Sequence, residues 1–131
     1  MDPFIFEAAP DLVSKCPDAF VAVVPDGVAS EAELFETYQR VLQLPDYFGR
    51  NWNALFDCLR DFSWIPQRAV VIVHEAVPVR LVAADLKIYL EVLEGAVAFW
   101  REPDNPEHSL VVSFPRGDEF SIYRLRRTSD E

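Results

Sequence analysis

The stretch RAVVIVHEA, residues 68–76, indicates how the rest of the chain folds. Its continuous run of β-branched residues is typical of a strand that is covered on both faces, as in a parallel sheet flanked by helices. Two further apolar runs have the same character, AFVAVVPDG at residues 19–27 and HSLVVSFP at residues 108–115. The first of them closes on a Pro-Asp-Gly turn. We therefore expect three buried strands.

Segments with helical spacing separate these runs. The first, SEAELFETYQRVLQL, opens with a capping box formed by Ser30 and Glu33, and it must end before Pro45. A second helix is predicted from about Trp52 to Phe62, and a third from about Val79 to Glu102. Strands that alternate with helices predict an α/β fold with a small, mainly parallel sheet, packed by helices and connected by right-handed crossovers.

Both ends of the chain lie outside this pattern, although we expect residues 1–131 to form a single domain. Residues 1–18 contain three prolines, which predict an irregular N-terminal extension. Residues 116–131 form a C-terminal extension. Its segment DEFSIYRL alternates imperfectly and suggests an extra edge strand, and its arginines are expected to lie in solvent.

Charge and composition narrow the possible functions. The chain has 12 basic and 22 acidic residues and a formal net charge of −10. Such a charge repels nucleic acids and anionic membranes and favours a basic partner, although acidity can also serve solubility alone. No CxxC motif, secretory signal or membrane-spanning run is present in this sequence. We expect a soluble cytoplasmic protein that binds neither nucleic acid nor membrane.

No catalytic or metal-binding motif stands out. The four glycines are not clustered as in a phosphate-binding loop, and His74 and His108 lack metal-ligand spacing. Cys58 fits a small buried hydrophobe better than a nucleophile. Asp57 and Asp61, with His74, are the best starting point for a small enzyme, but two acids one helical turn apart usually form a solvated face. We expect a protein that is not an enzyme and uses no metal or cofactor.

The stretch YFGRNWNALFDCLRDFSW, residues 47–64, carries the strongest functional pattern. Asn51 is a good N-cap for the predicted helix. One stripe of that helix would face the core: Trp52, Leu55, Cys58 or Leu59, and Phe62. The other stripe contains Asn53, Phe56, Asp57 and Arg60. An exposed aromatic beside a carboxylate is typical of an interface hot spot for a basic partner, but periodicity equally allows Phe56 to turn inward.

This stretch resembles the signature loop and helix of the barstar family of ribonuclease inhibitors. Residues 44–62, LPDYFGRNWNALFDCLRDF, follow the family pattern without a gap: proline, acid, two aromatics, Gly-x-Asn, then Ala-Leu-aromatic-Asp-Cys-Leu. The resemblance implies a small parallel sheet packed by helices. It also implies a cofactor-free inhibitor, antitoxin or immunity protein, which forms a heterodimer with a basic ribonuclease or toxin domain and occludes its active site.

The resemblance also implies roles for individual residues. Tyr47 corresponds to the loop aromatic that enters the nuclease cleft, and Asp57 to the central carboxylate that replaces a substrate phosphate. The other expected contact residues are Asn51, Trp52, Asn53, Phe56, Arg60 and Asp61. Element order assigns Glu102 as an additional acidic contact.

The chain departs from the family pattern at several of these positions. Asn53 stands where a second acid is expected, Phe56 replaces a tryptophan, and Arg60 and Asp61 replace small residues. The net charge over residues 46–61 is only −1. Of these departures, Asn53 and Phe56 favour an alternative in which the same scaffold inhibits a deoxyribonuclease or transferase toxin.

Overall fold

The structure is a computed structural model that describes residues 2–8, 11 and 14–127. Within those residues, four parallel strands form one sheet: β1 (Phe4–Phe6), β2 (Phe20–Val24), β3 (Ala69–His74) and β4 (Ser109–Phe114). The strand order is β1-β4-β3-β2, so β3 has a neighbour on each side. All residues from Val70 to Val73 are buried. The α/β class and the three expected strands are confirmed.

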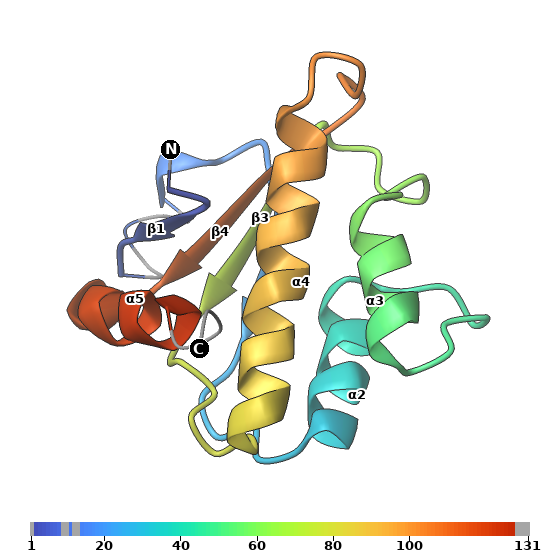
Figure 1. Ribbon diagram of the computed structural model, residues 1–131. Coiled ribbons are helices and arrows are strands. Elements are labelled where there is room, and N and C mark those ends of the chain that lie inside the picture. Colours follow the sequence, from blue (N-terminus) through green and yellow to red (C-terminus); the bar gives the residue numbers. More distant parts are fainter. Residues whose placement is uncertain (1, 9–10, 12–13, 128–131) are drawn as a thin grey trace.

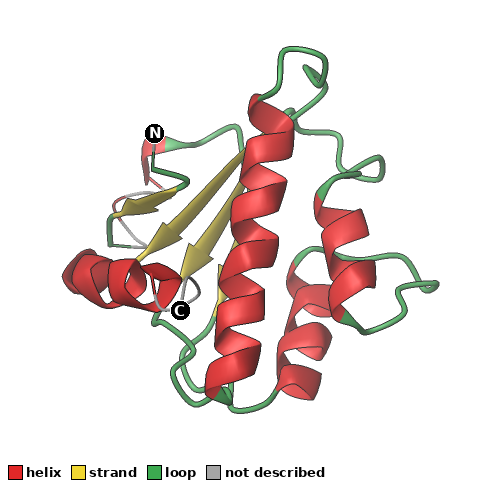
Figure 2. Cartoon of the chain, viewed as in Figure 1, coloured by secondary structure: helices red, strands yellow, loops and turns green. Residues whose placement is uncertain are grey.

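Helices cover one face of this sheet. Figure 1 shows α4 (Ala83–Arg101) crossing in front of the strands, with α2 (Glu31–Val41) and α3 (Trp52–Leu59) beside it. Figure 2 gives the same view coloured by secondary structure. The main core lies between these helices and the sheet, and its largest fully buried side chains include Tyr38, Phe62, Tyr89 and Phe114. On the opposite face Val71 and Val73 pack against Cys16 and Ala19.

The predicted boundaries of the helices are close to the observed ones, and local signals explain them. Ser30 Oγ accepts a hydrogen bond from Glu33 N, which confirms Ser30 as the N-cap. The Glu33 carboxylate accepts a hydrogen bond from Ala29 N, one residue before the cap, where a standard capping box would use Ser30 N. The helix expected to reach Phe62 ends at Leu59. Phe62 itself adopts a left-handed conformation with φ of 55° and still turns its ring into the core.

Two expectations for the chain ends were wrong. Residues 1–18 are not irregular throughout, because Phe4–Phe6 form β1 and pair with β4. As far as Arg127, the C-terminal extension adds no edge strand: η1 (Arg116–Asp118) is followed by the helix α5 (Glu119–Arg127). The outer edge of β4 is already occupied by β1, so a C-terminal strand has no place beside it.

A buried chain of polar side chains connects the sheet to α2 and α4. His74 Nδ1 lies 2.8 Å from Ser113 O, His74 Nε2 lies 2.6 Å from Tyr89 Oη, and Tyr89 and Tyr38 are joined through their hydroxyls. Burial lowers the pKa of His74 to about 4, so the imidazole is neutral near pH 7. A neutral ring that donates from Nδ1 to Ser113 O must accept at Nε2 from the Tyr89 hydroxyl. Both ring nitrogens of His74 are therefore satisfied by neighbouring groups.

Candidate functional site

The loop before α3 sends two consecutive aromatic side chains in opposite directions. Phe48 is buried and meets Phe35 of α2 edge to face, with ring centroids 6.1 Å apart. Tyr47 is 77% exposed. The buried ring therefore anchors the loop, and the exposed ring is available to a partner.

Asn51 fixes both the loop and the start of α3. Its Oδ1 accepts a hydrogen bond of 2.8 Å from Ala54 N, and its Nδ2 donates one of 3.2 Å to Gly49 O. The N-cap prediction is confirmed. Because the amide already serves the chain itself, Asn51 holds the geometry of the site as well as lying on its exposed surface.

Trp52 lies between the core and the surface. Its ring packs against Phe35, with centroids 4.9 Å apart, and lies 6.2 Å from the ring of Tyr89. The residue is half-buried. Trp52 therefore joins α3 to α2 and α4, and only part of its surface is open to a partner.

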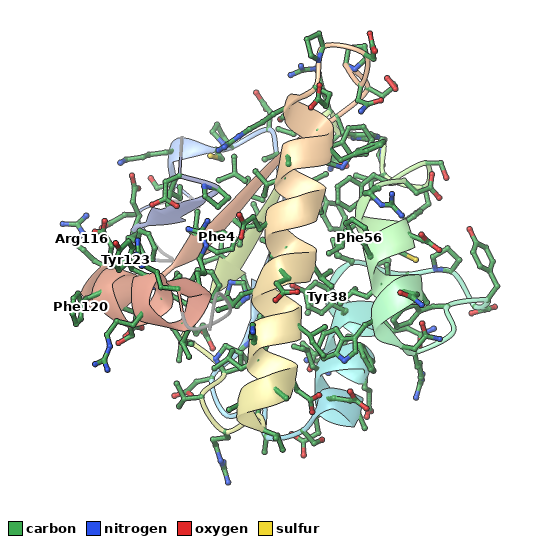
Figure 3. The ribbon with its side chains drawn as sticks, in the orientation of Figure 1. Phe4, Tyr38, Phe56, Arg116, Phe120 and Tyr123 are labelled. Carbon is green, nitrogen blue, oxygen red and sulfur yellow. The ribbon has the colours of Figure 1, made fainter. Side chains whose placement is uncertain are left out.

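Phe56 is the residue whose orientation the sequence left open. Its ring is half-buried and points from α3 toward α4 (Figure 3), where it meets Gly95 in the middle of that helix. The Cβ that an alanine would add at Gly95 would lie 3.0 Å from Cε1 of Phe56. Glycine is unfavourable inside a helix, and here its missing side chain makes room for the ring. Phe56 thus adds to the apolar contact between α3 and α4.

Arg60 covers the Phe56 ring and binds Asp57. The guanidinium carbon lies 3.8 Å from the centroid of the Phe56 ring, and Nη2 donates a 2.7 Å hydrogen bond to Asp57 Oδ1. Gly95, Phe56, Arg60 and Asp57 therefore form a continuous series of contacts, which we call the Phe56 stack. The Asp57 side chain is 73% exposed and that of Arg60 33%.

The Asp57–Arg60 pair changes the electrostatics of α3. An exposed ion pair contributes only about 0–1 kcal/mol to stability, so a partner can replace it at little cost. While it is intact, the positive charge of Arg60 offsets the charge of Asp57. The surface is therefore less anionic than a lone carboxylate would make it, as the net charge of the segment had indicated.

The remaining expected contact residues are exposed on α3, in the turn after it and at the end of α4. Asn53 and Asp57 are four residues apart on α3 and are exposed, and Asp61 is exposed in the turn that follows. Glu102 is the exposed C-cap of α4. The ends of α3 and α4 adjoin, because Trp100 Nε1 donates a hydrogen bond of 2.8 Å to Leu59 O.

The thiol of α3 is held in its protonated form. Cys58 is buried, and its pKa is raised by burial and then by the charges of Asp61 and Asp57, so the thiol stays protonated. Within the described part of the chain, no group of three or more His, Cys, Asp or Glu side chains is placed to hold a metal ion. None of the helices in that part is long and apolar enough to cross a lipid bilayer.

Sequence reasoning missed two residues that shape this surface, both on α4. Gly95 receives the Phe56 ring, and the Phe99 ring centroid lies 5.9 Å from the Arg60 guanidinium. Gly95 could have been noticed in the sequence, because an isolated glycine inside a long helical pattern usually makes room for a group packed against the helix. Phe99 carried no signal beyond its apolar character.

Fold and site together define a small parallel α/β protein whose loop and α3 present an aromatic ring and a carboxylate. A scan against protein-family models matches the family described as "Barstar (barnase inhibitor)" over residues 19–112. The chain belongs to the barstar family. No curated protein matched the chain in a separate search. The matched range runs from the start of β2 into β4, and therefore leaves out β1 and α5.

Proposed function

We propose that this protein is a stoichiometric inhibitor, an antitoxin or immunity protein, of a basic ribonuclease or ribonuclease toxin. It acts without a cofactor, by placing the loop at Tyr47 and the exposed face of α3 in the active site of its target. The observation that carries the proposal is the Asp57 carboxylate, which is 73% exposed on a helix fixed by the packing of Leu55, Cys58 and Leu59.

The chemistry of a ribonuclease cleft explains why a carboxylate would fill it. Such a cleft binds phosphate through cationic side chains, and a fixed carboxylate accepts charge-assisted hydrogen bonds from the same donors. The target's cations would replace Arg60 as the partner of Asp57. That exchange is favourable because the exposed pair is weak, whereas hydrogen-bonded charges at a desolvated interface are strong.

Tyr47 and Asn53 extend the contact on either side of Asp57. Tyr47 offers a large exposed ring, the type of side chain that is enriched in interface hot spots. Asn53 offers both a donor and an acceptor where a carboxylate would only accept. Glu102 and Asp61 supply acidic groups at the far end of the surface.

The charge and thiol content suit this role. A chain with net charge −10 attracts a basic target over long range. Cys16 and Cys58 are free thiols, which fits a reducing cytoplasm where a producing cell needs protection.

The test is an inhibition titration against basic ribonucleases, with barnase and any ribonuclease found to be encoded beside this chain as the targets. We expect one of them to lose activity at a one-to-one ratio. Asp57→Ala should weaken inhibition by about a hundredfold or more, because it leaves buried cations of the target unpaired. Asp18→Ala is the control, since Asp18 is exposed beside residues that pack on the opposite face of the sheet.

Two results would contradict the proposal. One is inhibition that Asp57→Ala leaves at the wild-type level. The other is a chain that spares both ribonucleases and blocks a deoxyribonuclease or a transferase.

A further inference from the structure

A second surface forms where the two ends of the chain meet. Figure 1 shows α5 beside β1, on the other side of α4 from α3. Ile122 of α5 is buried, and Arg126 of α5 pairs with Asp2 at 3.6 Å and with Glu94 of α4 at 3.0 Å. The helix is therefore held against both β1 and α4, and it lies outside the range that matches the barstar family.

One side of α5 exposes two aromatic rings. Phe120 is 69% exposed and Tyr123 is 53% exposed. Residues three apart share a face of a helix, and Arg116 and Arg127 lie about one turn before and after them on the same side. Figure 3 shows Arg116, Phe120 and Tyr123 together on the outer side of η1 and α5. We call these four residues the α5 stripe.

Two arginines of α5 contact its exposed aromatic rings. Arg127 Nη1 donates a hydrogen bond of 3.0 Å to Tyr123 Oη, and the Arg124 guanidinium carbon lies 5.8 Å from the Phe120 ring centroid. These contacts are exposed, so they leave the guanidinium groups accessible to an anionic partner. Stacked, planar guanidiniums are well suited to bidentate binding of carboxylates.

An open cavity of about 370 Å³ adjoins the stripe. Phe6 of β1 and Ile122, Phe120 and Tyr123 of α5 supply its apolar walls, and Asp2, Glu119 and Arg126 also line it. The volume falls in the lower part of the range of ligand pockets, about 300–1,000 Å³. It is large enough to receive an aromatic or leucine side chain.

The charge of the stripe indicates the class of partner. The α5 stripe carries two arginines on a chain whose net charge is −10. An anionic partner that contacts only this stripe is therefore attracted to it. A flat anionic membrane would also approach the acidic body of the protein. A single peptide segment meets fewer of those charges, because charges are screened beyond about 8 Å at physiological ionic strength. Asp2 and Glu119 line the cavity, which receives an apolar side chain, so the carboxylates of the segment lie beside Arg116 and Arg127 instead.

We propose that the α5 stripe and the adjoining cavity form a second docking surface, which binds an acidic segment of another protein. An aromatic or leucine side chain of that segment enters the cavity, and its carboxylates pair with Arg116 and Arg127. The surface is separate from α3, so the protein binds such a segment and the target of α3 at the same time.

The experiment is a selection of short random peptides on the full-length protein, followed by titration of the most enriched peptide. We expect the enriched sequences to place Asp or Glu around Trp, Phe or Leu. The peptide should shift amide resonances of α5 and β1. Phe120→Ser with Tyr123→Ser, and separately Arg116→Glu with Arg127→Glu, should each weaken its binding by about tenfold or more.

Matched controls use exposed residues of the same types elsewhere. Val79→Ser and Arg80→Glu change an exposed apolar residue and an exposed arginine on the connection to α4, and both should leave peptide binding unchanged. Asp57→Ala should also leave it unchanged. The unfolding temperature of every variant is measured, so that a loss of binding is not confused with a loss of folding.

Several outcomes would overturn this proposal. They are the absence of enriched acidic peptides, binding that survives both double substitutions, and binding of vesicles containing phosphatidylserine in place of peptides. Self-association that Phe120→Ser abolishes would make a second copy the occupant. Peptide binding seen only after Asp130→Asn and Glu131→Gln would make the chain's own acidic terminus the occupant.

Discussion

Arg60 donates a hydrogen bond of 2.7 Å to Asp57, the acid on which the proposed inhibition depends, while its guanidinium lies 3.8 Å from the centroid of the Phe56 ring. The central carboxylate is therefore partly neutralised by its own helix before any target arrives. A target must displace that arginine or accommodate it. Arg60 is thus the residue through which the affinity of this surface can be tuned.

Replacing Arg60 with alanine should strengthen binding to a basic ribonuclease. The variant loses a weak exposed ion pair and removes a positive charge from a surface that faces other positive charges. We expect a gain in affinity of about threefold to tenfold, measured by surface plasmon resonance. Arg80→Ala makes the same change in net charge away from α3 and controls for steering. If Arg60→Ala weakened binding as severely as Asp57→Ala, the pair would have to persist in the complex.

Replacing Gly95 with alanine should not stabilise the protein. In an open helix interior this change favours folding by about 0.5–1 kcal/mol, because glycine loses more backbone entropy. Here the added Cβ would lie 3.0 Å from the Phe56 ring and would push the Phe56 stack outward. We expect unchanged or reduced stability in urea unfolding and weaker binding of the target.

Gly117→Ala serves as the comparison for Gly95→Ala, since nothing lies within 4 Å of the position its Cβ would take. The double variant Phe56→Ala, Gly95→Ala should show coupling, because the small residue leaves room for the new methyl group. A full helix-propensity gain in Gly95→Ala alone would refute the packing role of Gly95.

Association with the target should slow as salt is added. The chain carries a net charge of −10, and long-range attraction to a basic protein is screened over about 8 Å at physiological ionic strength. Stopped-flow measurements between low and high sodium chloride should give an association rate that falls by about tenfold, with a much smaller change in the dissociation rate. An association rate independent of salt would show that electrostatic steering does not speed the association.

Stability should fall as the pH drops from about 6.5 to about 4 in a way that depends on His74. Burial lowers the pKa of His74 to about 4, so in this window the unfolded chain binds a proton that the folded chain does not. The loss from this residue is about 3 kcal/mol across the window. Urea unfolding of wild type and His74→Gln at both pH limits should show a smaller loss in the variant.

A direct measurement complements the urea experiment on His74. The imidazole resonances of His74 in the folded protein should show no titration down to about pH 5, by nuclear magnetic resonance. A midpoint near 6.5 would mean that the ring is not held neutral by the core.

The central part of the fold was predictable because its sequence pattern has one physical meaning. A β-branched run such as Val70 to Val73 indicates a strand that is covered on both faces. The N-cap hydrogen bond of Ser30 fixes where the following helix begins. The Asn51 cap likewise follows from local chemistry. These features depend on neighbours along the chain, so the sequence carries them directly.

The ends of the fold were not predictable in the same way. β1 has only three residues and follows a proline, and it exists because β4 offers an open edge. The apolar residues of α5 fit a strand or a helix equally well, and the observed helix is held against α4 by the pair Arg126–Glu94. Each of these outcomes depends on a partner that is distant in sequence.

The side-chain contacts around α3 were only partly predictable from the sequence. The exposure of Tyr47 and Asp57 agrees with the family pattern, whereas the orientation of Phe56 depends on Gly95, which lies on another helix. The spacing of Asp57 and Arg60 did allow an ion pair, because residues three apart are neighbours on a helix. The stacking of Arg60 on Phe56 required the structure.

The pairing of β1 with β4 also bears on how the protein is made. Residues 4–6 leave the ribosome long before Ser109–Phe114, the strand that they join. The sheet therefore cannot be completed until residue 114 has been synthesised, and a nascent chain must keep Phe4 and Phe6 unpaired until then. A chain that stopped before β4 would leave β1 as an apolar segment without its neighbour.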